Sequence, residues 1–366
     1  MHTPASILGR ILTGRQSPAA AGVDAAALAE MARQHGVAGL LWERLPAGDP
    51  SAAALRDALA DDITAAVVRD ALTRREVERV AGALETAGVR ALLVKGAALA
   101  CTIYQQSWHR PRTDTDLLVA HADVPAASRA LESCGYRRSD EVSTGEYVSY
   151  QMAFERLDPG GLRHVVDLHW KPVNPLLLAD ALPAERLWEE GTPLPGFTVS
   201  LVRVPSISDS VLLACVHRLA HHQEHERLIW LWDLKLLAGA MTPAQWARLA
   251  DEASARQLAA VCLDGLRRAR ALLDSPLPGD VEAALEAAAA SEPSRRYVEG
   301  PVSRRDVLVS DLRRLPDLSS RLRLLREHMF PSASFMRRRY GVNSTLLLPV
   351  LYLHRLVTGV SRWTRP

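Results

Sequence analysis

The sequence predicts an α+β fold, in which a small mixed β-sheet is flanked by N-terminal and C-terminal helical regions. Short apolar runs separated by turn residues are confined to the middle of the chain. The remainder has helical periodicity, is rich in alanine and leucine, and is interrupted by prolines. We therefore divide the chain into an N-terminal helical region at 1–88, a strand-bearing core at 89–204, and a C-terminal helical region with a basic tail at 205–366.

The N-terminal region contains two clear helix signals. Asp24 precedes an alanine-rich run and is a typical N-cap, and Gly36 is a typical C-terminal stop. A long helix is predicted over 51–86, ending before Gly88.

Composition limits the possible classes of protein. The 366 residues are 48% apolar and 23% charged, with a net charge of +2, which does not by itself indicate nucleic-acid binding. The four cysteines form no C-x-x-C pair and are expected to be reduced thiols. We find no signal-peptide pattern and no apolar run of about 18 residues, so we expect a cytoplasmic protein.

The most informative part of the core is an aspartate pair at the start of an apolar strand. Asp114 and Asp116 precede the run 117–119, and positions i and i+2 of a strand point to the same face. Two carboxylates so close repel each other unless a cation or a shared proton relieves them. Magnesium is the usual cation, because it takes oxygen ligands. A solvated loop is the ordinary alternative, but the flanking Arg110 and Arg112 favour a metal site.

A third carboxylate is predicted on a hairpin farther along the chain. Strands are expected over 147–156 and 163–170, joined by a turn at 158–161. Alternation in the second strand puts Asp167 on one face with Val165 and His169, and the apolar Val166, Leu168 and Trp170 on the other. The alternative is a structural carboxylate that pairs with Arg163 or His169.

Three motifs together resemble a known family. They are K-G-A-A-L from Lys95, which follows a predicted strand at 92–94 and opens a predicted helix at 97–105; Tyr104; and R-P-x-x-D-x-D-L-L-V from Arg110. The combination is similar to the uncharacterised bacterial nucleotidyltransferase family of the DNA polymerase β-like superfamily. In that subfamily Lys-Gly occupies the usual Gly-Ser turn, and an acidic residue followed by Leu-His-Trp is typical, as at Asp167. Thr115 departs from the usual aliphatic residue. The specific motifs lie between 94 and 170, with a weaker echo to about 235.

The resemblance implies a nucleotidyltransferase core that uses a nucleoside triphosphate such as ATP. Asp114, Asp116 and Asp167 would be catalytic and would bind two magnesium ions. Lys95, the backbone at Gly96 and Arg110 would hold the triphosphate. The acceptor is not determined by the sequence: a small molecule, a peptide or a sugar fits, and similar proteins are associated with polysaccharide and natural-product pathways.

A histidine cluster follows the core. His217, His221 and His225 are each one helical turn apart, which is a spacing that can bind zinc. The alternatives are a structural role, such as pairing with Asp233, or a place in the nucleotide cleft, where His217 and His221 would contact substrate.

The C-terminal segment 304–366 is strongly basic. It contains 13 arginines, no lysine and four acidic residues, a net charge of +9 that leaves −7 for residues 1–303. This asymmetry suggests an anionic partner surface. The apolar stretch 346–360 is too short to span a bilayer but can lie on an interface. The alternative is an arginine-rich helix that packs against the acidic remainder.

Two other classes of function are compatible with these motifs. A glycosyltransferase can use a D-x-D motif to bind a metal and a sugar nucleotide, although such enzymes place a βαβ region before the motif. A non-catalytic nucleotide-binding protein with a degenerate site is the other class.

Overall fold

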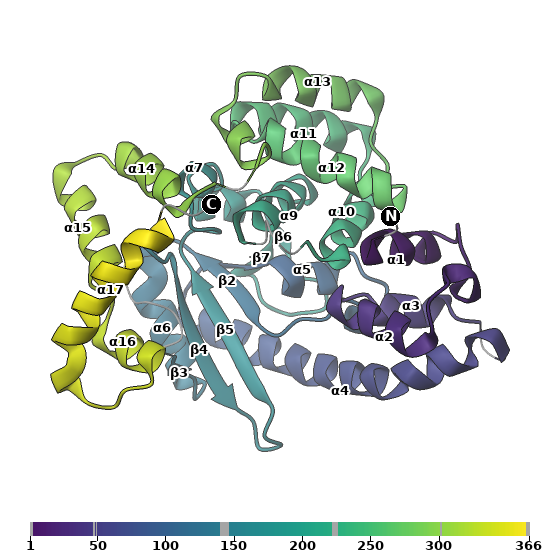
Figure 1. The fold of residues 1–366 in the computed structure, drawn as a ribbon, viewed down its shortest axis with the longest axis horizontal. Coiled ribbons are helices and arrows are strands. Elements are labelled where there is room, and N and C mark those ends of the chain that lie inside the picture. The colour runs from purple at the N-terminus through teal and green to yellow at the C-terminus, as the bar shows by residue number, and fades with distance from the viewer. Residues whose placement is uncertain are drawn as a thin grey trace.

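The computed structural model describes residues 3–46, 48, 50–139, 146–221, 226–300 and 302–363, apart from the side chains of 51, 221, 356–357 and 359–363. A central sheet is surrounded by helices, with the long helix α4 running along one side (Figure 1). The α+β class expected from the sequence is confirmed. Every described strand lies between 91 and 204, and the three-domain division stays a prediction.

The N-terminal helices begin at the residues that the capping signals indicate. The Asp24 carboxylate accepts a hydrogen bond from the Ala27 backbone N–H at 2.7 Å, so it is the N-cap. Gly36 and Gly88 have φ angles of 71° and 69°, the left-handed conformation that ends a helix. The helices are α1 (Pro4–Leu12), η1 (Pro18–Ala21), α2 (Ala25–Gln34), α3 (Ala38–Arg44) and α4 (Pro50–Thr86).

The sheet has seven strands in the order β3-β4-β5-β2-β1-β7-β6 and is mixed. Strand β2 pairs in parallel with β5 and antiparallel with β1, and β1 pairs in parallel with β7. The strands are β1 (Ala91–Val94), β2 (Thr115–Val119), β3 (Arg137–Arg138), β4 (Gln151–Leu157), β5 (Arg163–His169), β6 (Thr192–Pro193) and β7 (Val202–Val204).

Strands β4 and β5 form the predicted hairpin. Asp158 closes its turn, because its carboxylate accepts from the Leu162 N–H at 2.8 Å. Strand β4 begins later than residue 147, where the sequence predicted its start. The reason is that the backbone N–H groups of residues 146–148 donate to the Glu327 carboxylate at 2.8–3.1 Å, and Glu327 belongs to a C-terminal helix.

The remaining helices cover both faces of the sheet. The predicted helix at 97–105 begins earlier, at Lys95, and ends at Thr102. In chain order the elements are α5 (Lys95–Thr102), η2 (Ser107–His109), η3 (His121–Asp123), α6 (Val124–Ser133), α7 (Leu176–Ala179), α8 (Ala184–Glu189), α9 (Ile207–His221), α10 (Leu228–Ala240), α11 (Pro243–Ala255), α12 (Ala259–Leu273), α13 (Gly279–Ala289), η4 (Pro293–Tyr297), α14 (Arg304–Arg314), α15 (Leu318–Met329), α16 (Ala333–Tyr340), η5 (Thr345–Leu347) and α17 (Leu348–Trp363). No helix among these residues is long and apolar enough to cross a bilayer.

The sheet separates two apolar cores, because successive strand residues point to opposite faces. Leu92 and Leu118 join the core formed with α1–α3 and α9–α12. Leu93, Leu117 and Val166 join the core that contains the end of α4 and α6. Asp116 lies opposite Val94, on the face of the first core.

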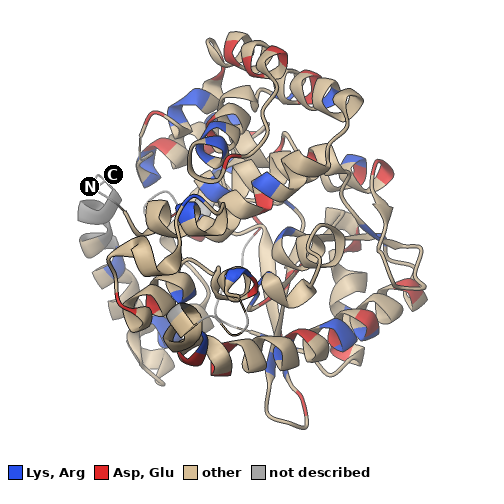
Figure 2. Cartoon of the chain, turned by 90° about the vertical axis from the view of Figure 1, so that its right-hand side faces the viewer, with Lys and Arg blue, Asp and Glu red and all other residues tan. Residues whose placement is uncertain are grey.

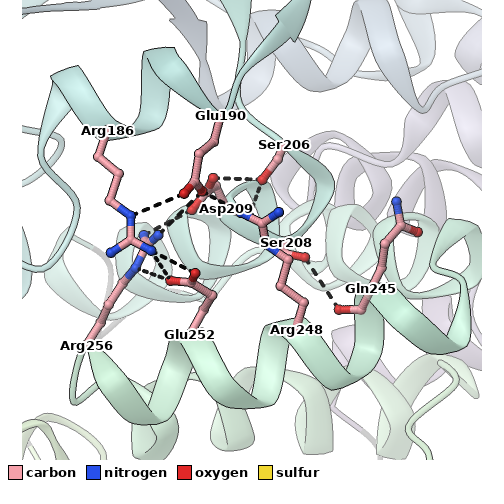
Figure 3. A network of polar contacts seen from close by, with 9 residues as sticks. All are labelled: Arg186, Glu190, Ser206, Ser208, Asp209, Gln245, Arg248, Glu252 and Arg256. Carbon is pink, nitrogen blue, oxygen red and sulfur yellow. Dashed lines mark hydrogen bonds and ion pairs between the residues drawn. The ribbon is translucent and has the colours of Figure 1, made fainter.

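A buried ion-pair network joins α8, α9 and α11 (Figure 3). Arg256, which follows α11, donates to Asp209 at 3.0 Å and to Glu252 at 2.8 Å. Ser206 donates to the other oxygen of Asp209 at 2.7 Å. Glu252 also accepts from Arg186 on α8. Asp209 and Arg256 are almost completely buried, so Asp209 depends on Arg256 for its charge compensation, whereas Arg256 is also compensated by Glu252.

Candidate functional site

The register between β2 and β5 brings two of the predicted carboxylates together. In this parallel pair Asp116 lies directly opposite Asp167, and His169 follows on the same face. Ligand atoms of Asp116, Asp167 and His169 all lie within 4.8 Å of one another. Gln151, the first residue of β4, donates to Asp167 at 3.3 Å. The alternation predicted for this strand is therefore present.

Lys95 lies at the centre of this cluster. Its ammonium is 2.6 Å from Asp116 Oδ1 and 3.3 Å from His169 Nε2, and His169 Nε2 is 2.8 Å from the same Asp116 oxygen. Lys95 follows β1 directly and has a φ angle of 53°, which is unusual for a residue other than glycine. Such strain, on the order of 1–3 kcal/mol, concentrates at functional sites. The turn aims the ammonium across the strand ends at the carboxylates.

The two aspartates of the pair have opposite electrostatic properties. Burial of Asp116 opposes its ionisation, but Lys95 and His169 outweigh burial and lower the pKa of this carboxyl far below its ordinary value. Asp114 precedes β2 and is half-buried; burial, followed by repulsion from Asp116, raises its pKa to about 6. Burial and then Lys95 lower the pKa of His169. The cluster therefore combines a stabilised anion with a carboxyl that a nearby cation would help to ionise.

Arg110 is positioned by a residue that the sequence did not identify as part of the site. Its Nε donates to both oxygens of Asp233 on α10, at 2.8 and 3.0 Å. The Tyr104 hydroxyl donates to Asp233 at 2.6 Å. A Cβ added at Gly96 would lie 3.2 Å from Arg110 Nη1, so glycine allows the guanidinium to approach the Lys95-Gly96 turn. All of these groups except Gly96 are charged or polar and largely buried.

Seven of the eight predicted site residues line one cavity of about 640 Å³. The cavity is large enough for a nucleotide-sized ligand. The seven are Lys95, Gly96, Arg110, Asp114, Asp116, Asp167 and His217. The side chain of the eighth, His221, lies outside the described part of the structure, and so does the whole of His225. The structure thus brings together positions that are up to 122 residues apart in the sequence.

Other cavity residues had no assigned role in the sequence analysis. Arg69 comes from α4, Arg227 precedes α10, and Trp230 lies 6.2 Å from the His217 ring, between ring centres. Arg69 and Arg227 carry no local sequence signal, because each belongs to an otherwise ordinary helix or helix start. Asp233 did carry one, since a carboxylate within the apolar run Trp230–Leu234 has to be buried with a partner.

The donor atoms present fit a divalent cation. Asp116 and Asp167 offer carboxylate oxygens from adjacent strands, which are the ligands that magnesium prefers, and Asp114 lines the same cavity. The compact group includes His169 in the place where the sequence analysis expected Asp114. No other such group of three occurs in the described part of the chain.

Comparison with known proteins identifies the family. The model of a family described as "Uncharacterised nucleotidyltransferase" matches residues 21–274, which include all eight predicted site residues. No curated protein sequence matches the chain. The family match extends from the N-terminal helices through the sheet to α12, so it covers the whole cavity. The chain therefore belongs to this nucleotidyltransferase family and is a transferase.

Proposed function

We propose that the protein transfers a nucleoside monophosphate from a nucleoside triphosphate to a hydroxyl group of an acceptor, in a magnesium-dependent reaction that releases pyrophosphate. The observation that carries this proposal is the β2–β5 register, which pairs Asp116 with Asp167 at the wall of a cavity that Lys95 and Arg110 also line. Carboxylates and cationic side chains that line one cavity suit a metal–triphosphate complex.

The carboxylates of the cavity would hold the metal. Asp114, Asp116 and Asp167 would be its ligands, with two ions expected. Bound magnesium would neutralise charge on the α-phosphate and lower the pKa of the acceptor hydroxyl. Asp167 is half-buried and faces the cavity, so it can also receive the proton of that hydroxyl.

The cationic side chains of the cavity would hold the triphosphate. The Lys95 ammonium and the backbone N–H groups at the start of α5 are suited to the β- and γ-phosphates. The Nε atom of Arg110 donates to Asp233, and Tyr104 donates to the same Asp233 oxygen. The direction of the Arg110 guanidinium is therefore fixed before substrate binds. His217 and Trp230, on the wall that α9 and α10 form, would contact the nucleoside or the acceptor.

The test is a transfer assay with the four nucleoside triphosphates, magnesium and a panel of sugar, peptide and small-molecule acceptors. We expect pyrophosphate release and an acceptor that gains the mass of a nucleoside monophosphate. Both signals should disappear in Asp116→Asn and persist in Glu155→Gln, an exposed carboxylate of the neighbouring hairpin that pairs with Arg163.

Two results would contradict the proposal and indicate a different function. Transfer of a sugar from a UDP-sugar, without pyrophosphate, would identify a D-x-D glycosyltransferase. Calorimetry that detects nucleotide binding independent of magnesium, together with no transfer to any acceptor, would identify a non-catalytic nucleotide-binding protein.

A further inference from the structure

The C-terminal helix α15 has apolar side chains on its solvent side. Leu318, Leu322 and Met329 are exposed and occupy positions i, i+4 and i+11, which lie on one face of a helix. Leu324, on another side of α15, is buried in the core that contains the end of α4 and α6. A surface helix ordinarily presents polar residues opposite its packed side, so α15 exposes a second apolar stripe.

The segment from η5 to α17 repeats this arrangement. Leu346, Val350 and Leu353 are exposed and are spaced at i, i+4 and i+7. Tyr352 lies on the packed side, where its hydroxyl donates to the Pro331 carbonyl at 2.6 Å. Its ring centre is 5.7 Å from that of Phe330, which connects α17 to the end of α15.

These stripes lie on helices α15 and α17, which contact each other. Of the twelve large apolar side chains exposed in the described part of the chain, nine lie between residues 309 and 353. We call this exposed apolar region the C-terminal apolar surface and define it by Leu318, Leu322, Met329, Leu346, Val350 and Leu353. Helices α14–α17 lie together on the side of the molecule opposite α1–α3 (Figure 1), and this region falls outside the family match at 21–274.

Exposed arginines accompany the C-terminal apolar surface. Arg323 and Arg326 lie on α15 beside Leu322, and Arg338 and Arg339 lie on α16, which packs against α17. The segment 304–366 has a net charge of +9. Helix α4, in contrast, carries both acidic and basic residues along its length (Figure 2). The C-terminal region therefore combines exposed aliphatic side chains with a net positive charge.

We propose that the C-terminal apolar surface lies on a lipid bilayer that contains anionic lipids. Aliphatic side chains would enter the boundary between headgroups and acyl chains, and the arginines would contact lipid phosphates. A second copy of the chain fits less well, because it would bring two strongly positive segments together. Nucleic acid fits the arginines but not the stripes, since leucine, valine and methionine offer no ring on which a base can stack.

The test is co-flotation of the full chain with vesicles. We expect binding to vesicles of equimolar phosphatidylcholine and phosphatidylglycerol, little binding to pure phosphatidylcholine, and weakening by high salt. The double variant Leu322→Ser/Leu353→Ser should bind about tenfold or more weakly, because both side chains would be inserted. Leu157→Ser is the matched control: Leu157 is 67% exposed but lies at the end of β4, and this variant should bind like the wild type.

Three outcomes would overturn the proposal. One is equal binding to neutral and anionic vesicles, and another is unchanged flotation of the double variant when its circular dichroism and melting temperature match those of the wild type. The third is a concentration-dependent dimer in sedimentation, or binding of a single-stranded RNA, that the double variant abolishes while vesicle binding is absent.

Discussion

The ammonium of Lys95 and the carboxylate of Asp116 form a buried ion pair, with Nζ 2.6 Å from Oδ1. The two side chains come from the element after β1 and from β2, and the strained backbone of Lys95 makes the contact possible. In the proposed mechanism the same carboxylate binds a cation. Lys95 therefore compensates the charge of Asp116 when no metal is bound. When a metal is bound, Lys95 and the metal both interact with the Asp116 carboxylate.

Lys95→Ala should lower the melting temperature of the metal-free protein and enlarge the stabilisation that magnesium produces. The variant leaves Asp116 without its strongest charge partner, and a cation then replaces the missing ammonium. Thermal melts with and without magnesium would measure both effects. Lys171→Ala is the control, because Lys171 pairs with Asp180 outside the cavity. Equal magnesium shifts in wild type and Lys95→Ala would show that Lys95 and the cation do not share a carboxylate.

Asp114→Asn should stabilise the metal-free protein above about pH 6 and abolish transfer. The pKa of Asp114 is raised from 3.8 to about 6, so between these values the folded protein holds a proton that the unfolded chain has lost. The free energy of unfolding contributed by Asp114 therefore falls as pH rises through this window and stays low above it. Asparagine removes this dependence. Melting temperatures of both proteins in chelator from pH 4 to 8 would measure it, and a constant difference would contradict the assignment.

Asp167→Asn should reduce transfer more than the roughly 10–100-fold typical of groups that only support a metal ligand, with the fold retained. The amide keeps the shape of the carboxylate and its place beside Gln151 but weakens metal binding. Steady-state kinetics across magnesium concentrations would measure the loss, with Glu155→Gln as the control on the paired strand. Near wild-type kcat at saturating magnesium would leave Asp167 with a structural role.

Asp233→Ala should be more destabilising than Tyr104→Phe. It would leave the buried Arg110 without its partner, which costs about 3–5 kcal/mol, whereas Tyr104→Phe removes one hydrogen bond to a carboxylate, worth about 1.5–3 kcal/mol. Denaturant unfolding would measure both. Because Asp233 also orients Arg110, the milder Asp233→Asn should raise KM for the triphosphate with a smaller effect on kcat. A lower kcat at unchanged KM would contradict this positioning role.

In the ion-pair network shown in Figure 3, replacing a buried residue should reduce protein stability more than replacing an exposed one. Asp209→Ala leaves the buried Arg256 with Glu252 as its remaining close carboxylate, so we expect a loss of about 1.5–3 kcal/mol in the free energy of unfolding, the value of a hydrogen bond between charged groups. Arg248→Ala removes an exposed partner of Glu190 and should cost about 1 kcal/mol or less. Transfer activity of both folded variants should match the wild type, since neither side chain lines the cavity. Equal losses would show that burial does not set the cost.

Several features were predictable from the sequence because their physical causes are local. The β4–β5 hairpin follows from the turn at 158–161 and from strand alternation, and a slip of one residue would have placed Leu168 in the cavity. The aspartate pair and the Lys95-Gly96 turn are short motifs with a defined backbone geometry. The amphipathic helices and the Asp24 cap likewise depend on neighbours a few residues away.

Other features depended on contacts between distant parts of the chain, which leave no pattern in the sequence. Glu327 accepts hydrogen bonds from the backbone N–H groups of residues 146–148, so β4 begins later in the sequence than predicted. Asp233 fixes Arg110 from a helix 123 residues away, and Lys95, which is expected to contact phosphate, also pairs with Asp116. A buried charged side chain pairs with whichever oppositely charged side chain the packing places beside it. The sequence by itself thus determined strands β1, β2, β4 and β5 and the acidic motif, whereas tertiary packing decided how each charge in the cavity is compensated.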